Sequence, residues 1–130
     1  KNTLKEGYPN IVIQDPVSGT EVPRVIRDFD IGMIPYNTEK ADMDYVFPRK
    51  ACEYLASGKP VISTGLREIA VLEPYVSIAD DADSFVDQVE RILRTNITAE
   101  QRRKFCTQFD WNCLMKNMTD SIFTVGEGNE

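Results

Sequence analysis

The segment from Pro48 to Thr64, PRKACEYLASGKPVIST, constrains the fold more than any other part of the chain. Pro48 suits the first position of a helix, where its missing N–H is not needed. Gly58 suits the left-handed position that ends a helix. The β-branched run Pro60–Thr64 then predicts a short buried strand. A helix that stops at a glycine and leads into a buried strand is typical of folds that layer helices on a sheet.

The start of this helix is predicted to be open to an anion. With Pro48 at the first helical position, Phe47 takes the N-cap, and its side chain cannot accept a hydrogen bond. We therefore expect the N–H groups of Arg49 and Lys50 to lack a local acceptor, which leaves positive partial charge at the helix end. Lys50 and Glu53 are neighbours on the helix surface. The lysine can meet a phosphate while the glutamate accepts hydrogen bonds from hydroxyls.

The same residues also fit a plain surface helix with one exposed ion pair, which is common and weakly stabilising. The uncapped start, the glycine stop and the following strand favour a ligand site. The segment by itself leaves the two interpretations about equally supported. The packing face is predicted to consist of Ala51 and Leu55, with Cys52 and Ala56 beside them.

Composition limits what the whole chain can be. Its 130 residues, 42% of them hydrophobic, suit one domain over residues 1–130, with a frayed tail at 126–130. The net charge of −6 argues against a general nucleic-acid binder. No apolar run reaches the length of a membrane span, and the N-terminus does not read as a signal peptide. We therefore expect a cytoplasmic protein.

The chemistry-bearing residue types exclude several kinds of active site. The chain has no histidine, which excludes Ser-His-Asp and Cys-His pairs and any histidine-ligated metal within it. Cys52, Cys106 and Cys113 lack metal-finger or CxxC spacing, so we expect reduced thiols. The acidic stretch Glu39–Asp44 is expected to be a solvated loop rather than a metal site. No glycine-rich nucleotide-binding loop is present.

The rest of the chain alternates predicted strands and helices. Strands are expected at Asn10–Gln14, Asp30–Pro35, Pro60–Thr64 and Tyr75–Ala79. Helices are expected at about residues 21–29, 48–57, 66–72 and 81–96, and again from Thr98, where Thr98 and Gln101 form a capping box. The aspartates Asp80, Asp81 and Asp83 are interpreted as helix-capping and first-turn charges. A late apolar stripe is interpreted as core; it consists of Trp111, Leu114, Met118, Ile122 and Phe123.

This alternation predicts an α/β fold with a Rossmann-like parallel sheet of about four strands and helices on both faces. In such sheets ligands bind outside the carboxyl ends of the strands. The loops after Gln14, Pro35 and Thr64 should lie at that edge, together with the start of the Pro48 helix. We therefore expect one crevice that gathers the candidate site residues.

Two stretches, FDIGMIPY at residues 29–36 and the Pro48–Thr64 segment, carry a family resemblance. Together they resemble the C-terminal, donor-binding half of GT-B-fold glycosyltransferases of the group 1 type, in a bacterial surface-polysaccharide branch. The resemblance extends from about Pro9 to Ser121 and includes Phe109-Asp110-Trp111 before a last helix. It implies a domain truncated relative to the full GT-B C-terminal domain. The full-length enzyme would transfer a sugar from a nucleotide diphosphate donor to a hydroxyl acceptor.

The resemblance also implies roles for individual residues. Lys50 would contact the donor pyrophosphate, and Glu53 would bind the ribose. The Thr64-Gly65 turn would approach the donor from below. Tyr45 stands where the family often has a glutamate, eight positions before Glu53, so the donor-sugar contact of that glutamate is not carried over. The remaining candidates are Arg49 and Tyr54 for the donor and Asp15, Pro16 and Val17 for the nucleobase.

By the same resemblance the substrate is a nucleotide sugar, and catalysis needs neither a metal nor another cofactor. The family's N-terminal acceptor domain and the first two β-α units of its donor domain have no counterpart here, so we expect the chain alone to be inactive. The full enzyme would lie in the cytoplasm, at the inner face of the membrane. Two alternatives stay open: a non-catalytic nucleotide-binding or assembly module, and a fragment of a GT-B-fold nucleotide-sugar epimerase.

Overall fold

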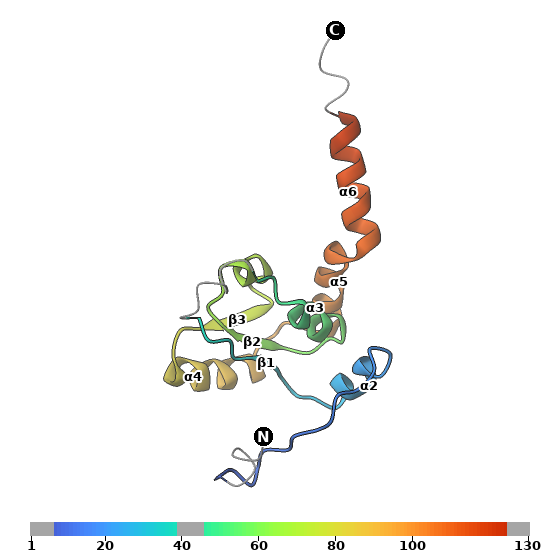
Figure 1. The fold of residues 1–130 in the computed structure, drawn as a ribbon. Helices are drawn as coiled ribbons and strands as arrows, with labels where there is room; N and C mark the ends of the chain where they lie inside the picture. Colours follow the sequence, from blue (N-terminus) through green and yellow to red (C-terminus); the bar gives the residue numbers. More distant parts are fainter. Residues whose placement is uncertain (1–6, 39–45, 125–130) are drawn as a thin grey trace.

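The structure is a computed structural model that describes residues 7–38 and 46–124 (Figure 1). Element labels follow Figure 1, with η for 3₁₀ helices. The elements are α2 (Val22–Arg27), β1 (Gly32–Ile34), α3 (Arg49–Ala56), β2 (Val61–Thr64), η2 (Arg67–Leu72), β3 (Val76–Ala79), α4 (Ala82–Leu93), α5 (Ala99–Cys106), η3 (Thr107–Phe109) and α6 (Trp111–Thr124). Tyr45, the stretch Glu39–Asp44 and the tail 126–130 lie outside the described residues.

The sheet is parallel, as the alternation of elements predicted. Its three strands lie in the order β1-β2-β3, with Gly32 beside Val61 and Val61 beside Val76. The strand predicted at Asn10–Gln14 is wrong, because this segment pairs with no strand of the described part of the chain and Val12 is 78% exposed. β-branched residues favour extended backbone, but a strand also needs a neighbour to pair with. The α/β class is therefore confirmed with three strands in the described part instead of about four.

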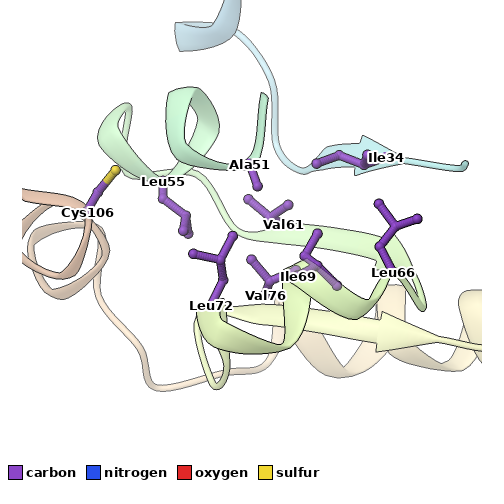
Figure 2. Packing of buried hydrophobic residues seen from close by; sticks show 9 residues of the cluster. All are labelled: Ile34, Ala51, Leu55, Val61, Leu66, Ile69, Leu72, Val76 and Cys106. Carbon is purple, nitrogen blue, oxygen red and sulfur yellow. The ribbon is translucent and has the colours of Figure 1, made fainter. Parts of the chain in front are cut away.

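Helices cover both faces of the sheet, as predicted (Figure 1). Helix α3 contacts β1 and β2 and η2 contacts β3, whereas α4 contacts β2 and β3 from the opposite face. In the close view of the core, Ala51 and Leu55 of α3 point toward Val61 of β2 and Leu72 of η2 (Figure 2). These four side chains are fully buried. They fix the position of α3 relative to the carboxyl ends of the strands.

Two glycines hold α3 in this position. Gly58 has φ +79°, so it ends the helix in the left-handed region that was predicted for it. At Gly32 of β1 an added Cβ would collide with the ring of Tyr54. Only glycine therefore lets Tyr54 pack flat on the first strand.

Local capping signals in the sequence are also confirmed. Asp81 caps α4 by accepting a hydrogen bond from the N–H of Ser84 at 2.8 Å. Thr98 and Gln101 form a reciprocal capping box at the start of α5. Helices α4 and α5 therefore begin where their side chains predict.

The last helix, α6, does not belong to the core. Figure 1 shows it extending away from the sheet beyond α5. The residues of the predicted apolar stripe are exposed, from 44% for Leu114 to 72% for Trp111 and Phe123, with Met118 and Ile122 between. The prediction that this stripe is core is therefore wrong. Helical spacing shows which residues share a face, but not whether another layer covers that face.

Candidate functional site

The start of α3 differs by one residue from the prediction. Pro48, with φ −78° and ψ 88°, is the N-cap instead of Phe47, because this ψ lies outside the helical region. The N–H of Arg49 donates to the carbonyl oxygen of Phe47 at 3.0 Å, so the expectation that it lacks an acceptor is wrong. The N–H of Lys50 has no acceptor among the described residues, and no side chain caps the helix. Within the described residues, the helix start therefore keeps one open donor beside a lysine.

Lys50 lies at the carboxyl end of β1. Its exposed side chain lines a hollow of about 180 Å³ with Met33, Ile34, Pro35 and Tyr36. The predicted placement of Lys50 at the carboxyl edge of the sheet is confirmed by this geometry.

A larger hollow, of about 560 Å³, lies at the carboxyl ends of all three strands and shares Met33, Pro35 and Tyr36 with the first. Thr64 at the end of β2 and Asp80 after β3 also line it. The hydroxyl of Thr64 donates to the carbonyl oxygen of Tyr36 at 3.0 Å. A Cβ at Gly65 would lie 3.2 Å from Oδ1 of Asp80, so the turn after β2 passes close to this carboxylate. We call Tyr36, Lys50, Thr64, Gly65 and Asp80 the strand-edge site.

Glu53 faces a different hollow. It lines a groove of about 680 Å³ between α3, α5, η3 and the start of α6, together with Arg103 and Asp110. Glu53 and Lys50 form no ion pair in the described structure. The single crevice expected to gather both residues is therefore divided between the strand-edge site and this groove.

The other predicted donor residues, Arg49 and Tyr54, line neither hollow of the strand-edge site. Arg49 is exposed on the first turn of α3. Tyr54 is half-buried against Phe29, with 6.2 Å between ring centroids. Burial, followed by the charge of Glu53, raises the pKa of the Tyr54 phenol. Asp15, Pro16 and Val17 are exposed ahead of α2 and line none of the hollows that contain Lys50, Thr64 or Glu53.

Two residues of the strand-edge site, Tyr36 and Asp80, were not among the sequence-based site candidates. Tyr36 lies two residues after the end of β1, and Asp80 directly follows the end of β3. That position is the usual location of ligand-binding residues in such sheets, so the signal was present in the sequence. Asp81 was correctly interpreted as a cap: its pKa is lowered by the backbone and side-chain hydrogen bonds of Ser84.

The thiols lie in the Glu53 groove. Cys52, Cys106 and Cys113 all line it, and all three are free. The thiol of Cys106 donates to the carbonyl oxygen of Cys52 at 3.3 Å. Burial, reinforced by Cys106, raises the pKa of Cys52 to about 12, so this thiol stays protonated near neutral pH. In the ranges that the structure describes, no group of three or more His, Cys, Asp or Glu residues is arranged to hold a metal ion.

Similarity to a known protein family identifies the chain that carries this arrangement. Residues 1–95, which include β1, α3, β2, β3 and the whole strand-edge site, match the family model described as group 1 glycosyl transferases. The chain belongs to the group 1 glycosyltransferase family. This confirms the resemblance carried by residues 29–36 and 48–64.

A relative in Bacillus subtilis (strain 168), TuaH, is named a glycosyltransferase of teichuronic acid biosynthesis. It is 34% identical over 117 residues, which cover 85% of this chain and 29% of that relative. The chain thus spans less than a third of the length of the curated relative it matches. No solved structure matches the chain. Among the described residues, no helix has both the length and the apolar character to span a membrane.

Proposed function

We propose that this chain supplies the donor-nucleotide-binding part of a glycosyltransferase that moves a sugar from a nucleotide diphosphate to a hydroxyl acceptor. The observation that carries the proposal is the position of Lys50. It stands on the open first turn of α3, beside the carboxyl end of β1, in a chain of the group 1 family. A cation and a helix N-terminus at one point favour a diphosphate there.

The proposed role of Lys50 is to stabilise the leaving group. When the bond between the sugar and the phosphate breaks, negative charge develops on the departing diphosphate. The Lys50 ammonium and the Lys50 backbone N–H, which has no acceptor among the described residues, can stabilise that charge without a metal ion. The Asp80 carboxylate and the Thr64 oxygen, at the same edge, can accept hydrogen bonds from sugar hydroxyls.

For Glu53 to bind the ribose, the donor must lie along α3. Glu53 is three residues beyond Lys50, a rise of about 4.5 Å along the helix axis. A nucleotide with its pyrophosphate at Lys50 can then extend its ribose toward the groove that Glu53 lines. Contact of the nucleobase with Asp15, Pro16 and Val17, and of the donor with Arg49, Tyr45 and Tyr54, stays a prediction.

Calorimetric titration of the chain with uridine, guanosine and adenosine diphosphates tests the role of Lys50. The best-bound nucleotide should lose about tenfold or more in affinity on Lys50→Ala, since hydrogen bonds to charged groups contribute this much. Lys104→Ala is the matched control, because Lys104 is an exposed lysine on α5, away from the strand-edge site. Equal affinities for the two variants would overturn the proposed role.

The reaction itself is tested with a polypeptide of the length of TuaH that contains this sequence. The proposal expects a labelled sugar to pass from the nucleotide to an acceptor, and the acceptor-binding part and any contact with the inner membrane face to lie outside this chain. Nucleotide binding without transfer would favour a non-catalytic module. Conversion of the nucleotide sugar to its epimer would favour an epimerase.

A further inference from the structure

Arg102 on α5 is a buried charge with little compensation. Only 6% of the Arg102 surface is exposed. Its single hydrogen bond in the described structure runs from Nη1 to the carbonyl oxygen of Gly58, at a long 3.4 Å, and it forms no ion pair there. A guanidinium carries several N–H donors in a fixed fork, so most of these donors are unused. Burying a charge in this way is costly unless a partner is supplied.

Arg102 also lines a cavity. This cavity, of about 150 Å³, lies between β3, the end of α4 and the start of α5. Among the described residues, no fully enclosed side-chain nitrogen or oxygen lacks a hydrogen bond. The guanidinium nitrogens of Arg102 that make no hydrogen bond are therefore not fully enclosed. The cavity is well above the ~10–15 Å³ that a single water needs, so it has room for a small ligand.

The other lining residues make the cavity basic and rich in hydroxyls. Arg91, near the end of α4, reaches it and forms no ion pair among the described residues, whereas its neighbour Arg94 pairs with Glu90 at 3.8 Å. Ser77 and Thr95, which carry hydroxyls, also line it, and no Asp or Glu does. In a chain of net charge −6, two arginines facing one cavity without a carboxylate reverse the local charge.

We propose that this cavity binds a phosphate group or a tetrahedral oxyanion of the same size. Two guanidinium forks match the oxygens of a phosphate in a bidentate geometry, and hydroxyls add further donors. Thr95 Oγ1 already accepts the N–H of Ile97 at 3.4 Å, so its own proton remains to donate. The bound anion would supply the counter-charge that Arg102 lacks and would join β3, α4 and α5.

This site is separate from the strand-edge site and does not rest on the proposed function. Tyr75 and Pro74, which precede β3, lie on its wall, as do Thr95 and Ile97 between α4 and α5. It is therefore at the amino ends of the strands, at the opposite edge of the sheet from Lys50. Loss of nucleotide binding at Lys50 would leave this inference unaffected.

Titration with inorganic phosphate at constant ionic strength, followed by amide NMR of the chain, tests the site. Saturable shifts are expected at Ser77, Thr95 and Arg102, with a rise in melting temperature because the anion binds only the folded chain. Arg91→Gln should weaken phosphate binding about tenfold or more. Arg94→Gln, three residues further along at the C-cap of α4 and outside the cavity, is the matched control and should bind as the wild type does.

The geometry of recognition is tested with Arg102→Lys, which keeps the charge but not the fork; it should bind phosphate more weakly than the wild type. Should that variant not fold, the comparison of Arg91→Gln with Arg94→Gln decides alone. Equal shifts with chloride or acetate, or equal affinities of the two Gln variants, would overturn the site. Arg102 would then serve only to link α5 to Gly58.

Discussion

At the scale of single residues, Cys52 shows how its surroundings set the chemistry of a side chain. Burial, with a contribution from Cys106, raises its pKa from an ordinary 9.0 to about 12. Below pH 9 the thiol is protonated in both the folded and the unfolded chain, so it adds no pH dependence. Between pH 9 and about 12 the folded chain holds a proton that the unfolded chain releases. The free energy of unfolding must therefore fall as the pH rises through this window.

We expect Cys52→Ala to make this alkaline loss of stability less steep. Urea unfolding from about pH 8 to about pH 10 measures the pH dependence of the free energy of unfolding. Above pH 10 the raised pKa of Tyr54 would also lower this free energy as the pH rises, so the range ends there. The pKa of Cys106 is also raised by burial, so in Cys52→Ala the free energy of unfolding should still fall with rising pH, but less steeply. Cys113→Ala is the control from the same groove. A slope for Cys52→Ala that equals the wild-type slope would contradict the account.

At the scale of elements, the sequence was informative where structure depends on a few neighbouring residues. The glycine at position 58, the capping box of Thr98 and Gln101 and the Asp81 cap act over one helical turn, so their outcome could be predicted. The N-cap of α3 was missed by one residue because both Phe47 and Pro48 lack a capping side chain.

Two predictions that required a distant partner failed. Asn10–Gln14 has strand-forming residues, but no described strand pairs with it. Helix α6 has an apolar face from Trp111 to Phe123, but nothing in the described structure covers that face. Hydrophobic spacing defines a face and leaves its partner undetermined.

The exposure of α6 predicts unequal effects of core and stripe substitutions in this chain. Replacing Met118 and Ile122 together by Gln should change the free energy of unfolding by no more than about 0.5 kcal/mol, as for surface positions. Leu55→Ala, at a fully buried position, should cost about 2–5 kcal/mol. Chemical denaturation of both variants makes the comparison. A loss of about 2 kcal/mol or more for the α6 variant would show that this helix is packed in solution.

At the scale of the whole molecule, the site could be predicted only in part. Lys50 was placed correctly because a helix after a parallel strand begins at the carboxyl edge of the sheet. Tyr36 and Asp80 follow strands and could have been included on the same argument. Glu53 could not be assigned to its groove, because its spacing from Lys50 gives a shared helix surface but not the hollow that each side chain lines.

The family match and the proposed strand-edge site lie in the same part of the chain. Residues 1–95 carry the group 1 glycosyltransferase match and contain the strand-edge site, whereas α5 and α6 follow it. The chain corresponds to 29% of TuaH, so acceptor recognition is proposed to depend on sequence outside it.

The most direct test of the central claim is to map where a nucleotide diphosphate binds on this chain by amide NMR. The account predicts saturable shifts centred on Tyr36, Lys50 and Thr64, extending toward Glu53 and much reduced in Lys50→Ala. Shifts confined to residues outside the strand-edge site, or identical shifts in the wild type and Lys50→Ala, would contradict it.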